Sequence, residues 1–274
     1  MRIVMIGVSH WHTPFYADPV LGMEDATIVG VSDPDASRAA PLAVRAGCPV
    51  FTDYREMCAT RRPDFAFALG RHRDMAEEAR FLIESCIPFA MEKPCAVNAA
   101  EAQDIAHRAA MARVFAAVPL VMRYCPLIET IREVAAGERI QYLSFKFVGG
   151  MVDRYHQQKV EWVIDRAISG GGPLLNLGIH HIDLCRVLLG NAELAVTGAM
   201  MSNRAAGLRI EDHAIMLMQG AGQAAWWRPA ISTRRSTRYS TCTTASAPRG
   251  TTSRRATTRR SRSSPTTGSA PRGP

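Results

Sequence analysis

The chain contains 274 residues, which is long enough for two domains. It carries 33 lysines and arginines against 25 aspartates and glutamates, a formal net charge of +8. We expect no membrane span and no signal peptide, because no apolar run is long enough and the first residues lack a small-residue cleavage site. The seven scattered cysteines, with no Cys-x-x-Cys pair, argue against a zinc site and a disulfide framework, and favour a cytoplasmic protein without a metal.

The excess positive charge lies in the C-terminal part of the sequence. Residues 222–274 hold eleven arginines, no lysine and no carboxylate, and removing these charges from +8 leaves −3 for residues 1–221. From Trp226 onward the chain is rich in Arg, Ser, Thr, Pro and Ala and has no apolar periodicity, which is typical of disorder. The segment could be a basic arm that binds nucleic acid, a tail without a role, or a reading-frame artefact. We favour the artefact, because a shifted frame of codons for Trp-Trp-Arg-Pro can encode Val-Glu-Ala-Gly, which would continue a strand.

Strands and helices alternate along the first 122 residues. Short apolar runs predict strands at residues 2–7, 26–33, 50–51, 64–69, 88–92 and 114–122. Helices are expected between them, at residues 12–23, 35–46, after Asp53, 75–85, and from the capping Asn98 to 112. This alternation predicts an α/β domain, a doubly wound parallel sheet with helices on both faces and a ligand-binding edge at the C-terminal ends of the strands.

The pattern changes after Pro126. A helix is expected at residues 127–136, a glycine loop at 170–172 with a helix that follows it to Leu189, and strands at 140–148, 192–201 and 212–219. These elements predict a smaller α+β domain with an open and incomplete sheet. We expect the first domain at residues 1–120, the second at 121–221, and the arginine-rich tail at 222–274.

The turns after the first two strands suggest a dinucleotide site. Gly7-Val8-Ser9-His10-Trp11-His12 lies where a G-x-G-x-x-G turn would follow the first strand, although only its first glycine is retained. Asp33 ends the second strand, 26 residues after Gly7, and its carboxylate could accept both ribose hydroxyls and repel a 2′-phosphate. This favours NAD over NADP. The alternatives are an ordinary strand–turn–helix and a turn aspartate before Pro34.

Two further segments carry groups suited to proton transfer. Glu92-Lys93-Pro94 closes the fifth strand, where a rigid backbone could aim the ammonium group at a substrate hydroxyl. Asn176, His180 and Asp183 recur at i, i+4 and i+7 after the glycine loop, so we expect them near one face of a helix. The alternatives are a surface lysine in a turn and histidines that cap or pack a helix.

These segments together resemble the Gfo/Idh/MocA oxidoreductase family over residues 1 to about 221. The resemblance rests on the glycine turn, the acid after strand two, Glu92-Lys93-Pro94, Arg123-Tyr124-Cys125-Pro126 and the segment GGGPLLNLGIHHID at 170–183. It implies a Rossmann-type N-terminal domain and an NAD(P)-dependent dehydrogenase. Such an enzyme transfers a hydride between the nicotinamide and a sugar, cyclitol or related polyol.

The resemblance also implies roles for single residues. Lys93 would hydrogen-bond the reacting oxygen and His180 would take or return its proton, whereas the amide of Asn176 could only orient the substrate or His180. Asp183 is expected to orient or cap, and His181 to face away. Substrate contacts are expected from Arg123, Asn176 and His180. Cofactor contacts are expected from Gly7, Ser9, His10, Asp33, Gly70, Glu92 and Lys93.

Besides the incomplete glycine turn, the chain departs from the family pattern at two places. The strand-four loop, residues 70–75, has Met75 where the family usually has a histidine. The arginine-rich tail replaces later strands, so we expect an exposed sheet edge and poor stability, with a homo-oligomer only if the sheet is complete. Two alternative functions remain: a catalytically impaired NAD(P)-binding homologue, and nucleic-acid binding through the tail, which the acidic body disfavours because it has no basic stripe.

Overall fold

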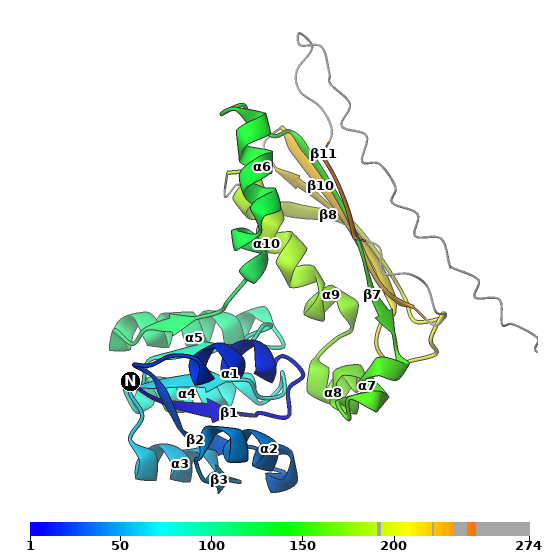
Figure 1. The fold of residues 1–274 in the computed structure, drawn as a ribbon. Helices are drawn as coiled ribbons and strands as arrows, with labels where there is room; N and C mark the ends of the chain where they lie inside the picture. Colours follow the sequence, from blue (N-terminus) through cyan, green and yellow to red (C-terminus); the bar gives the residue numbers. More distant parts are fainter. Residues whose placement is uncertain (191–192, 221, 233–239, 245–274) are drawn as a thin grey trace, which may run out of the picture.

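The computed structural model describes residues 1–190, 193–220, 222–232 and 240–244, and these form two domains (Figure 1). The N-terminal domain is a sheet layered between helices. The C-terminal domain is a broad sheet with helices against one face. Within the described ranges, no helix has both the length and the apolar character that a membrane span needs.

The N-terminal sheet has six parallel strands in the order β3-β2-β1-β4-β5-β6. Its strands are β1 (Arg2–Ile6), β2 (Thr27–Ser32), β3 (Val50–Phe51), β4 (Phe65–Ala68), β5 (Phe89–Met91) and β6 (Ala116–Ala117). The helices that connect them are α1 (Thr13–Leu21), α2 (Ala36–Ala46), α3 (Tyr54–Arg61), α4 (Met75–Glu84) and α5 (Ala99–Ala112). The doubly wound parallel sheet is thereby confirmed.

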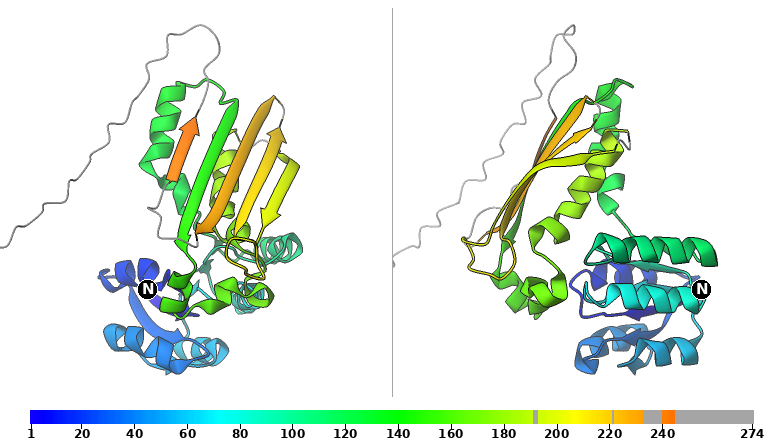
Figure 2. Two further views of the ribbon diagram at one scale, coloured as in Figure 1. Left: turned by 90° about the vertical axis from the view of Figure 1, so that its right-hand side faces the viewer. Right: turned by 180° about the vertical axis from the view of Figure 1, so that it is seen from behind.

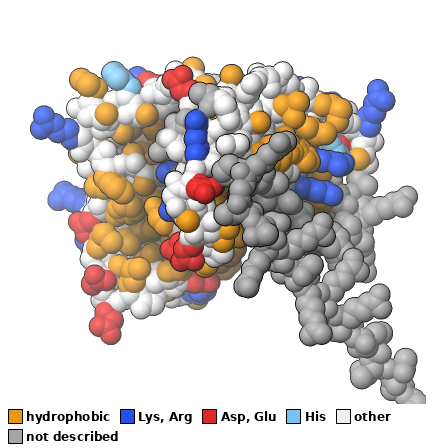
Figure 3. Space-filling view, turned by 90° about the horizontal axis from the view of Figure 1, so that it is seen from above, with side chains coloured by type: hydrophobic (Ala, Val, Ile, Leu, Met, Phe, Trp, Pro, Cys, Tyr) orange, Lys and Arg blue, Asp and Glu red, His pale blue; other side chains and the backbone are white. Residues whose placement is uncertain are grey.

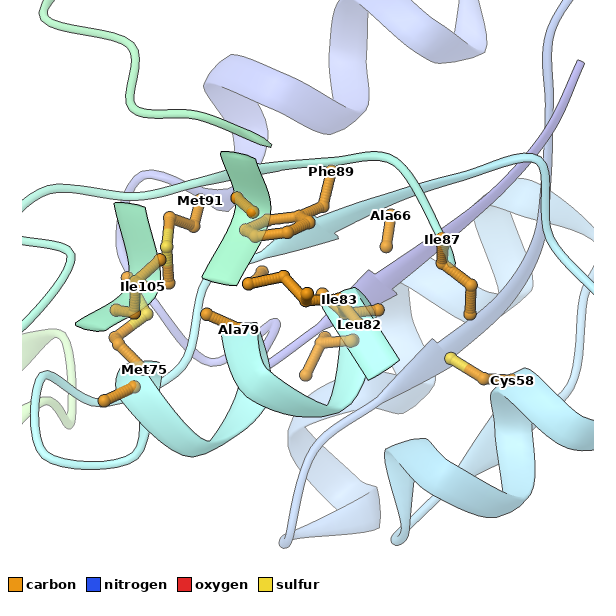
Figure 4. Close-up of a cluster of buried hydrophobic side chains, with 14 of the residues drawn as sticks. Cys58, Ala66, Met75, Ala79, Leu82, Ile83, Ile87, Phe89, Met91 and Ile105 are labelled. Atoms are coloured by element: carbon orange, nitrogen blue, oxygen red, sulfur yellow. The ribbon is translucent and has the colours of Figure 1, made fainter. Parts of the chain in front are cut away.

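Two apolar clusters, one on each face of this sheet, hold the helices in place. In the cluster of Figure 4, Leu82 and Ile83 of α4 pack toward Phe89 of β5. The predicted caps are present, since the side chain of Asp53 accepts a hydrogen bond from the Arg55 amide and that of Asn98 from the Glu101 amide.

The last predicted strand of this domain, 114–122, is shorter than expected. Only Ala116 and Ala117 pair with β5. Pro119 cannot donate to a ladder, and the chain turns instead into the 3-10 helix η1 (Val121–Tyr124).

The C-terminal sheet has the strand order β11-β7-β10-β9-β8. Its strands are β7 (Tyr142–Met151), β8 (Ala195–Ser202), β9 (His213–Gly220), β10 (Gln223–Ser232) and β11 (Ser240–Thr244). Strand β10 runs parallel to β7 and antiparallel to β9, so the sheet is mixed. Helices α6 (Pro126–Ala135) and α10 (Gly178–Leu188) lie on one face of this sheet, and the described residues place no helix on its other face (Figure 2).

Short elements between β7 and α10 bring the second domain against the first. They are α7 (Asp153–Gln157), η2 (Glu161–Ile164), α8 (Arg166–Ser169) and α9 (Pro173–Asn176). The sequence did not predict the first three, because single turns carry no readable apolar period.

Strand β10 corrects the prediction that the sheet stops at residue 221. Gln223, Ala225 and Trp227 are buried while the residues between them are more exposed, a period of two that the tail's polar composition obscured. Trp227 is fully buried and packs in the core beneath the sheet. The remainder of the predicted tail, 233–239 and 245–274, lies outside the described residues.

Candidate active site

The turn after β1 requires glycine because two backbone segments meet there. Gly7 has φ +71°, and a Cβ at this position would lie 2.5 Å from the Cα of Gly70, which follows β4. A Cβ on Gly70 would in turn overlap the carboxyl group of Glu78. Beside this contact lies a cavity of about 630 Å³ whose walls include Gly7, Ser9, Asp33 and Gly70, as predicted for the cofactor.

Asp33 is buried at the C-terminal end of β2, and it holds the turn as well as facing the cavity. Its Oδ2 accepts a hydrogen bond from the Ser9 amide at 2.8 Å, and its Oδ1 accepts one from the Asp35 amide at 3.1 Å. A carboxylate fixed in this way can accept hydrogen bonds from a ribose, so the residues present fit the adenosine half of NAD.

The charges around this cavity favour NAD over NADP. Its walls carry four cationic side chains: Arg55 pairs with Glu77 at 2.5 Å, Arg71 pairs with Asp74 at 2.7 Å, Arg38 donates to backbone carbonyls, and Lys159 is the fourth. Six acidic side chains outnumber them, at Asp33, Asp35, Asp53, Asp74, Glu77 and Glu161, while burial raises the pKa of a seventh, Glu78, to about 8. A 2′-phosphate would therefore meet more repulsion than attraction.

Lys93, the second residue after β5, is the buried cation of a second cavity of about 200 Å³. Its Nζ donates hydrogen bonds to Oδ1 of Asn176 at 2.6 Å and to the carbonyl oxygen of Asn176 at 2.9 Å. Burial and the nearby charge of Arg154 lower the pKa of Lys93 to about 8, although Glu92 opposes them. Two donors are thus fixed by Asn176, and the third remains for a ligand.

Asn176 therefore has a different neighbour from the one predicted. The expected continuous helix is broken at Leu177, which separates α9 from α10. Asn176 consequently does not share a helix with His180, and it orients Lys93 rather than the imidazole.

His180, on the first turn of α10, lines the same cavity as Lys93. Its Nδ1 is buried and has no hydrogen-bond partner among the described residues. Burial first, and then the charge of Lys93, lower the pKa of His180 to about 4, so the imidazole is neutral near pH 7. His181 points the other way, as expected, and stacks on Trp227 with ring centroids 5.5 Å apart.

Glu92 and His10 occupy a buried cluster beside the cavities rather than their walls. Glu92 accepts hydrogen bonds from the Lys93 amide at 2.9 Å and from the Tyr16 hydroxyl at 2.6 Å, and it lies 3.2 Å from Nδ1 of His12. Burial alone would raise the pKa of Glu92, but the hydrogen bond with His12 and the charges of Lys93, His10 and His12 outweigh it and hold the pKa below its ordinary range. Glu92 and His10 thus support Lys93 and the first turn, and their predicted contacts with the cofactor stay predictions.

The same cluster contains a set of atoms suited to a metal ion. The ligand atoms of His10, His12 and Glu92 lie within 4.8 Å of one another. Hydrogen bonds already use both carboxylate oxygens of Glu92, and Nδ1 of His10 accepts from the His12 amide at 3.1 Å. We therefore interpret the cluster as a hydrogen-bonded support, and the absence of a metal stays a prediction.

Arg123 does not reach the cavity, contrary to the predicted substrate contact. Its Nε donates to Oδ2 of Asp183 at 2.6 Å, and its second nitrogen donates to Oδ1 of the same carboxylate. This bidentate ion pair ties η1 to α10, and within the described part of the chain the walls of the cavity do not include Arg123. Asp183 orients, as expected, but its partner is Arg123.

The glycine loop is fixed from two sides. Gly172 and Leu174 donate their amide hydrogens to the carboxylate of Glu211, each at 2.9 Å. From the N-terminal domain, Nδ1 of His72 lies 2.9 Å from the Ser169 carbonyl oxygen. His72 thus gives the unusual strand-four loop a role in joining the domains, which the sequence did not indicate.

The sequence also missed most of the walls of the Lys93 cavity. Besides Lys93, Asn176 and His180, they comprise Trp11, His12, Met122, Phe147, Arg154 and Leu177. Trp11, His12 and Leu177 lie in segments that the sequence singled out, but no motif or spacing assigned these six residues a role. The one available signal was Arg154, a cation that follows the end of a predicted strand by six residues.

Family models match both domains. Residues 1–119 match "Oxidoreductase family, NAD-binding Rossmann fold", and residues 134–238 match "GFO/IDH/MocA C-terminal domain". The chain is 24% identical over 209 residues to trans-1,2-dihydrobenzene-1,2-diol dehydrogenase of Sus scrofa, a match that covers 74% of this chain and 59% of that protein. It thus spans less than two thirds of this curated relative.

Solved structures share the fold. The chain superposes on GenD2 from gentamicin A biosynthesis, in complex with NAD, with a TM-score of 0.78 and 22% identity over 88% of this chain and 68% of that one. For levoglucosan dehydrogenase in complex with NADH and levoglucosan, the TM-score is 0.75 with 17% identity over 88% and 70%. At such identities the likeness establishes the fold alone. Taken with the two domain matches, it means that the chain belongs to the Gfo/Idh/MocA family, with an N-terminal NAD-binding Rossmann domain.

Proposed function

We propose that the protein is an NAD-dependent dehydrogenase that acts on a CH–OH group of a sugar, cyclitol or related polyol. The observation that carries this proposal is the convergence of a buried lysine and a neutral histidine, Lys93 and His180, in one small cavity. The cavity lies at the C-terminal edge of the dinucleotide-binding sheet, where such folds bind ligands.

Lys93 holds the reacting oxygen in this proposal. Asn176 fixes two of its three donors, so the remaining N–H points its charge at one substrate oxygen. A positive charge beside the hydroxyl stabilises the alkoxide that develops as the proton leaves. Glu92 supports this arrangement by accepting the Lys93 amide hydrogen.

His180 takes the hydroxyl proton. Its lowered pKa keeps the imidazole neutral, hence able to accept, at any pH above about 4. The cofactor, when bound, supplies the hydride acceptor. Asp33 and the Gly7 turn hold its adenosine half, and the alcohol is oxidised to a carbonyl with one hydride and one proton leaving.

The relatives support the substrate class. The Sus scrofa relative carries the name of a dehydrogenase that acts on a diol, and one structural neighbour is a dehydrogenase bound to levoglucosan with NADH. The alternative from the sequence, a catalytically impaired NAD-binding homologue, predicts the same cofactor binding without turnover.

Two measurements test the proposal. Quenching of tryptophan fluorescence by NADH reports cofactor binding, and absorbance of NADH reports oxidation of a panel of polyols, cyclitols and sugars. We expect Lys93→Met and His180→Gln to abolish turnover and retain NADH binding, while the matched exposed controls Lys146→Met and His107→Gln retain both. Turnover that survives both active-site substitutions would refute the mechanism, and binding without any turnover by the unmodified protein would favour the impaired homologue.

We further propose a division into domains at residue 120, a cytoplasmic location and a homo-oligomer. The location is supported by the thiols Cys48, Cys58, Cys86, Cys95 and Cys125. The homo-oligomer is supported by apolar side chains on the face of the sheet that α6 and α10 do not cover, since Met200 and Leu217 are each about half exposed. Figure 3, which views the molecule from the top of Figure 1, shows hydrophobic side chains gathered at the surface. Light scattering of the purified protein tests the association.

A further inference from the structure

Arg154, on α7, is a cation of the active-site cavity that lacks a counter-ion. Its guanidinium donates to the Gly149 carbonyl oxygen and, at 2.6 Å, to the Tyr155 hydroxyl. It also stacks over the Tyr155 ring at 4.6 Å. Its Nε is buried without a hydrogen-bond partner, and no carboxylate of the described residues forms an ion pair with it.

The cavity therefore holds more positive than negative charge. Lys93 and Arg154 both line it, and Glu92 is the neighbouring carboxylate. Arg154 lies close enough to Lys93 to lower its pKa. Placing two cations near each other in a largely buried site is unfavourable unless an anion joins them. The oxidised nicotinamide carries a further positive charge, so NAD⁺ in its site would increase the excess of positive charge.

We propose that Arg154 binds a carboxylate of the substrate, and that the enzyme oxidises a small hydroxy acid or sugar acid in preference to a neutral polyol. This inference rests on the proposed dehydrogenase function and names the substrate class of the same site. The carboxylate takes no part in the reaction. The carbinol C–H bond breaks with its hydride passing to NAD⁺, the O–H proton passes to His180, and the products are a keto acid, NADH and a proton.

The donors that Arg154 still has match this ligand. A guanidinium carries five N–H donors, and the contacts to Gly149 and Tyr155 use two of them. Three N–H donors remain. Because Nε itself is buried, the remaining N–H of each outer nitrogen would form the fork that holds a carboxylate. A neutral polyol could satisfy a donor here, but it would leave the charge uncompensated.

The cavity size limits the substrate. A volume of about 200 Å³ lies below the range of roughly 300–1,000 Å³ for ligand pockets of drug size. It suits a compound with a few carbons and one carboxylate better than a nucleotide-linked sugar. Lys93 and His180 at one part of the wall and Arg154 at another would then fix the molecule at two points, the reacting hydroxyl and the acid.

The test compares pairs of compounds that differ in one carboxylate, with NAD⁺ saturating. Gluconate is paired with sorbitol, galactonate with galactitol, and glucuronate with glucose. We expect at least one acid to exceed its neutral partner in kcat/KM by about 10- to 100-fold, the range expected for a hydrogen bond to a charged group. Arg154→Met should lower this ratio toward one, Arg154→Lys should retain part of it, and the exposed control Arg186→Met should leave it unchanged.

A second readout separates failure of this inference from failure of the proposed function. Thermal stabilisation of the NAD-bound protein by each compound measures binding without turnover, and thermal unfolding also reports whether the variants fold. Neutral polyols that are oxidised as well as their acids, or an acid preference that survives in Arg154→Met, would overturn the inference and leave the dehydrogenase proposal intact. If nothing is oxidised, the dehydrogenase proposal fails. Thermal stabilisation by the acids that is lost in Arg154→Met would then still support a carboxylate site at Arg154, and its absence would overturn that site.

Discussion

Replacing Asn176 by aspartate should raise the pKa of Lys93, because it turns a neutral acceptor into a charged one. Oδ1 of Asn176 lies 2.6 Å from the Lys93 ammonium nitrogen. With an effective dielectric constant of about 20, two unit charges at this distance attract by roughly 6 kcal/mol, and such partners shift measured pKa values by about 1 to 3 units. The pKa of Lys93 should therefore rise from about 8 to roughly 9–11 in Asn176→Asp.

The rate at which cyanate carbamoylates Lys93 measures this pKa without any substrate, because only the neutral amine reacts. Mass spectrometry of the Lys93 peptide across pH 6 to about 11 gives the titration. The pH profile of oxidation gives a second reading. If the charged lysine holds the reacting oxygen, kcat/KM of the unmodified protein falls as the pH rises through about 8, and in the variant it falls at the higher pKa.

Asn203→Asp is the matched control, because Asn203 is exposed and is not among the residues that line the Lys93 cavity. It should leave both titrations unchanged. A pKa of Lys93 that stays within about half a unit of its original value in Asn176→Asp would contradict the arrangement described above.

Two further predictions concern the cofactor and the core. Asp33→Asn should weaken NAD binding by about 10- to 100-fold and NADP binding less, because the Ser9 amide and the ribose lose a charged acceptor. Titration calorimetry measures the two affinities. An unchanged NAD affinity would exclude Asp33 as the ribose ligand. Gly178→Ala should destabilise the protein by about 1–3 kcal/mol in thermal unfolding, because the added Cβ would overlap the buried Trp227 ring. Gly22→Ala is the matched control. Its Cβ would lie 3.5 Å from the Pro19 carbonyl oxygen, an ordinary contact, so stability should change little.

The N-terminal domain could be predicted because its strands have a local sequence signature. Strands β1, β2 and β5 are apolar runs that stop just before Gly7, Asp33 and Glu92-Lys93, and caps such as Asn98 mark where helices begin. The residues at the strand ends then had to converge, because parallel strands share one edge. The sequence accordingly predicted that Lys93 and His180 meet, and they line one cavity.

What failed were contacts that depend on tertiary geometry. The i, i+4 spacing of Asn176 and His180 suggested a shared helix face, but the break at Leu177 turns Asn176 toward Lys93. Arg123 was expected to contact the substrate, but its guanidinium forms an ion pair with Asp183. Arg154 belongs to a single helical turn between domains, which has no period for a sequence pattern to reveal.

The C-terminal part of the sheet also bears on the reading-frame hypothesis. Trp227 fills a site that only glycine at position 178 leaves open, so the chain as far as Trp227 suits the fold. The next two residues, Arg228 and Pro229, stay in register with β7, whereas the pairing of β10 with β9 passes from Trp227–Met216 to Ala230–His213. Proline has no N–H to donate to a ladder, and β10 is a central strand. This irregularity falls within the four residues where the hypothesis places the shift, but the family match continues to residue 238, so the hypothesis stays a prediction that the codons for Trp226 to Pro229 decide.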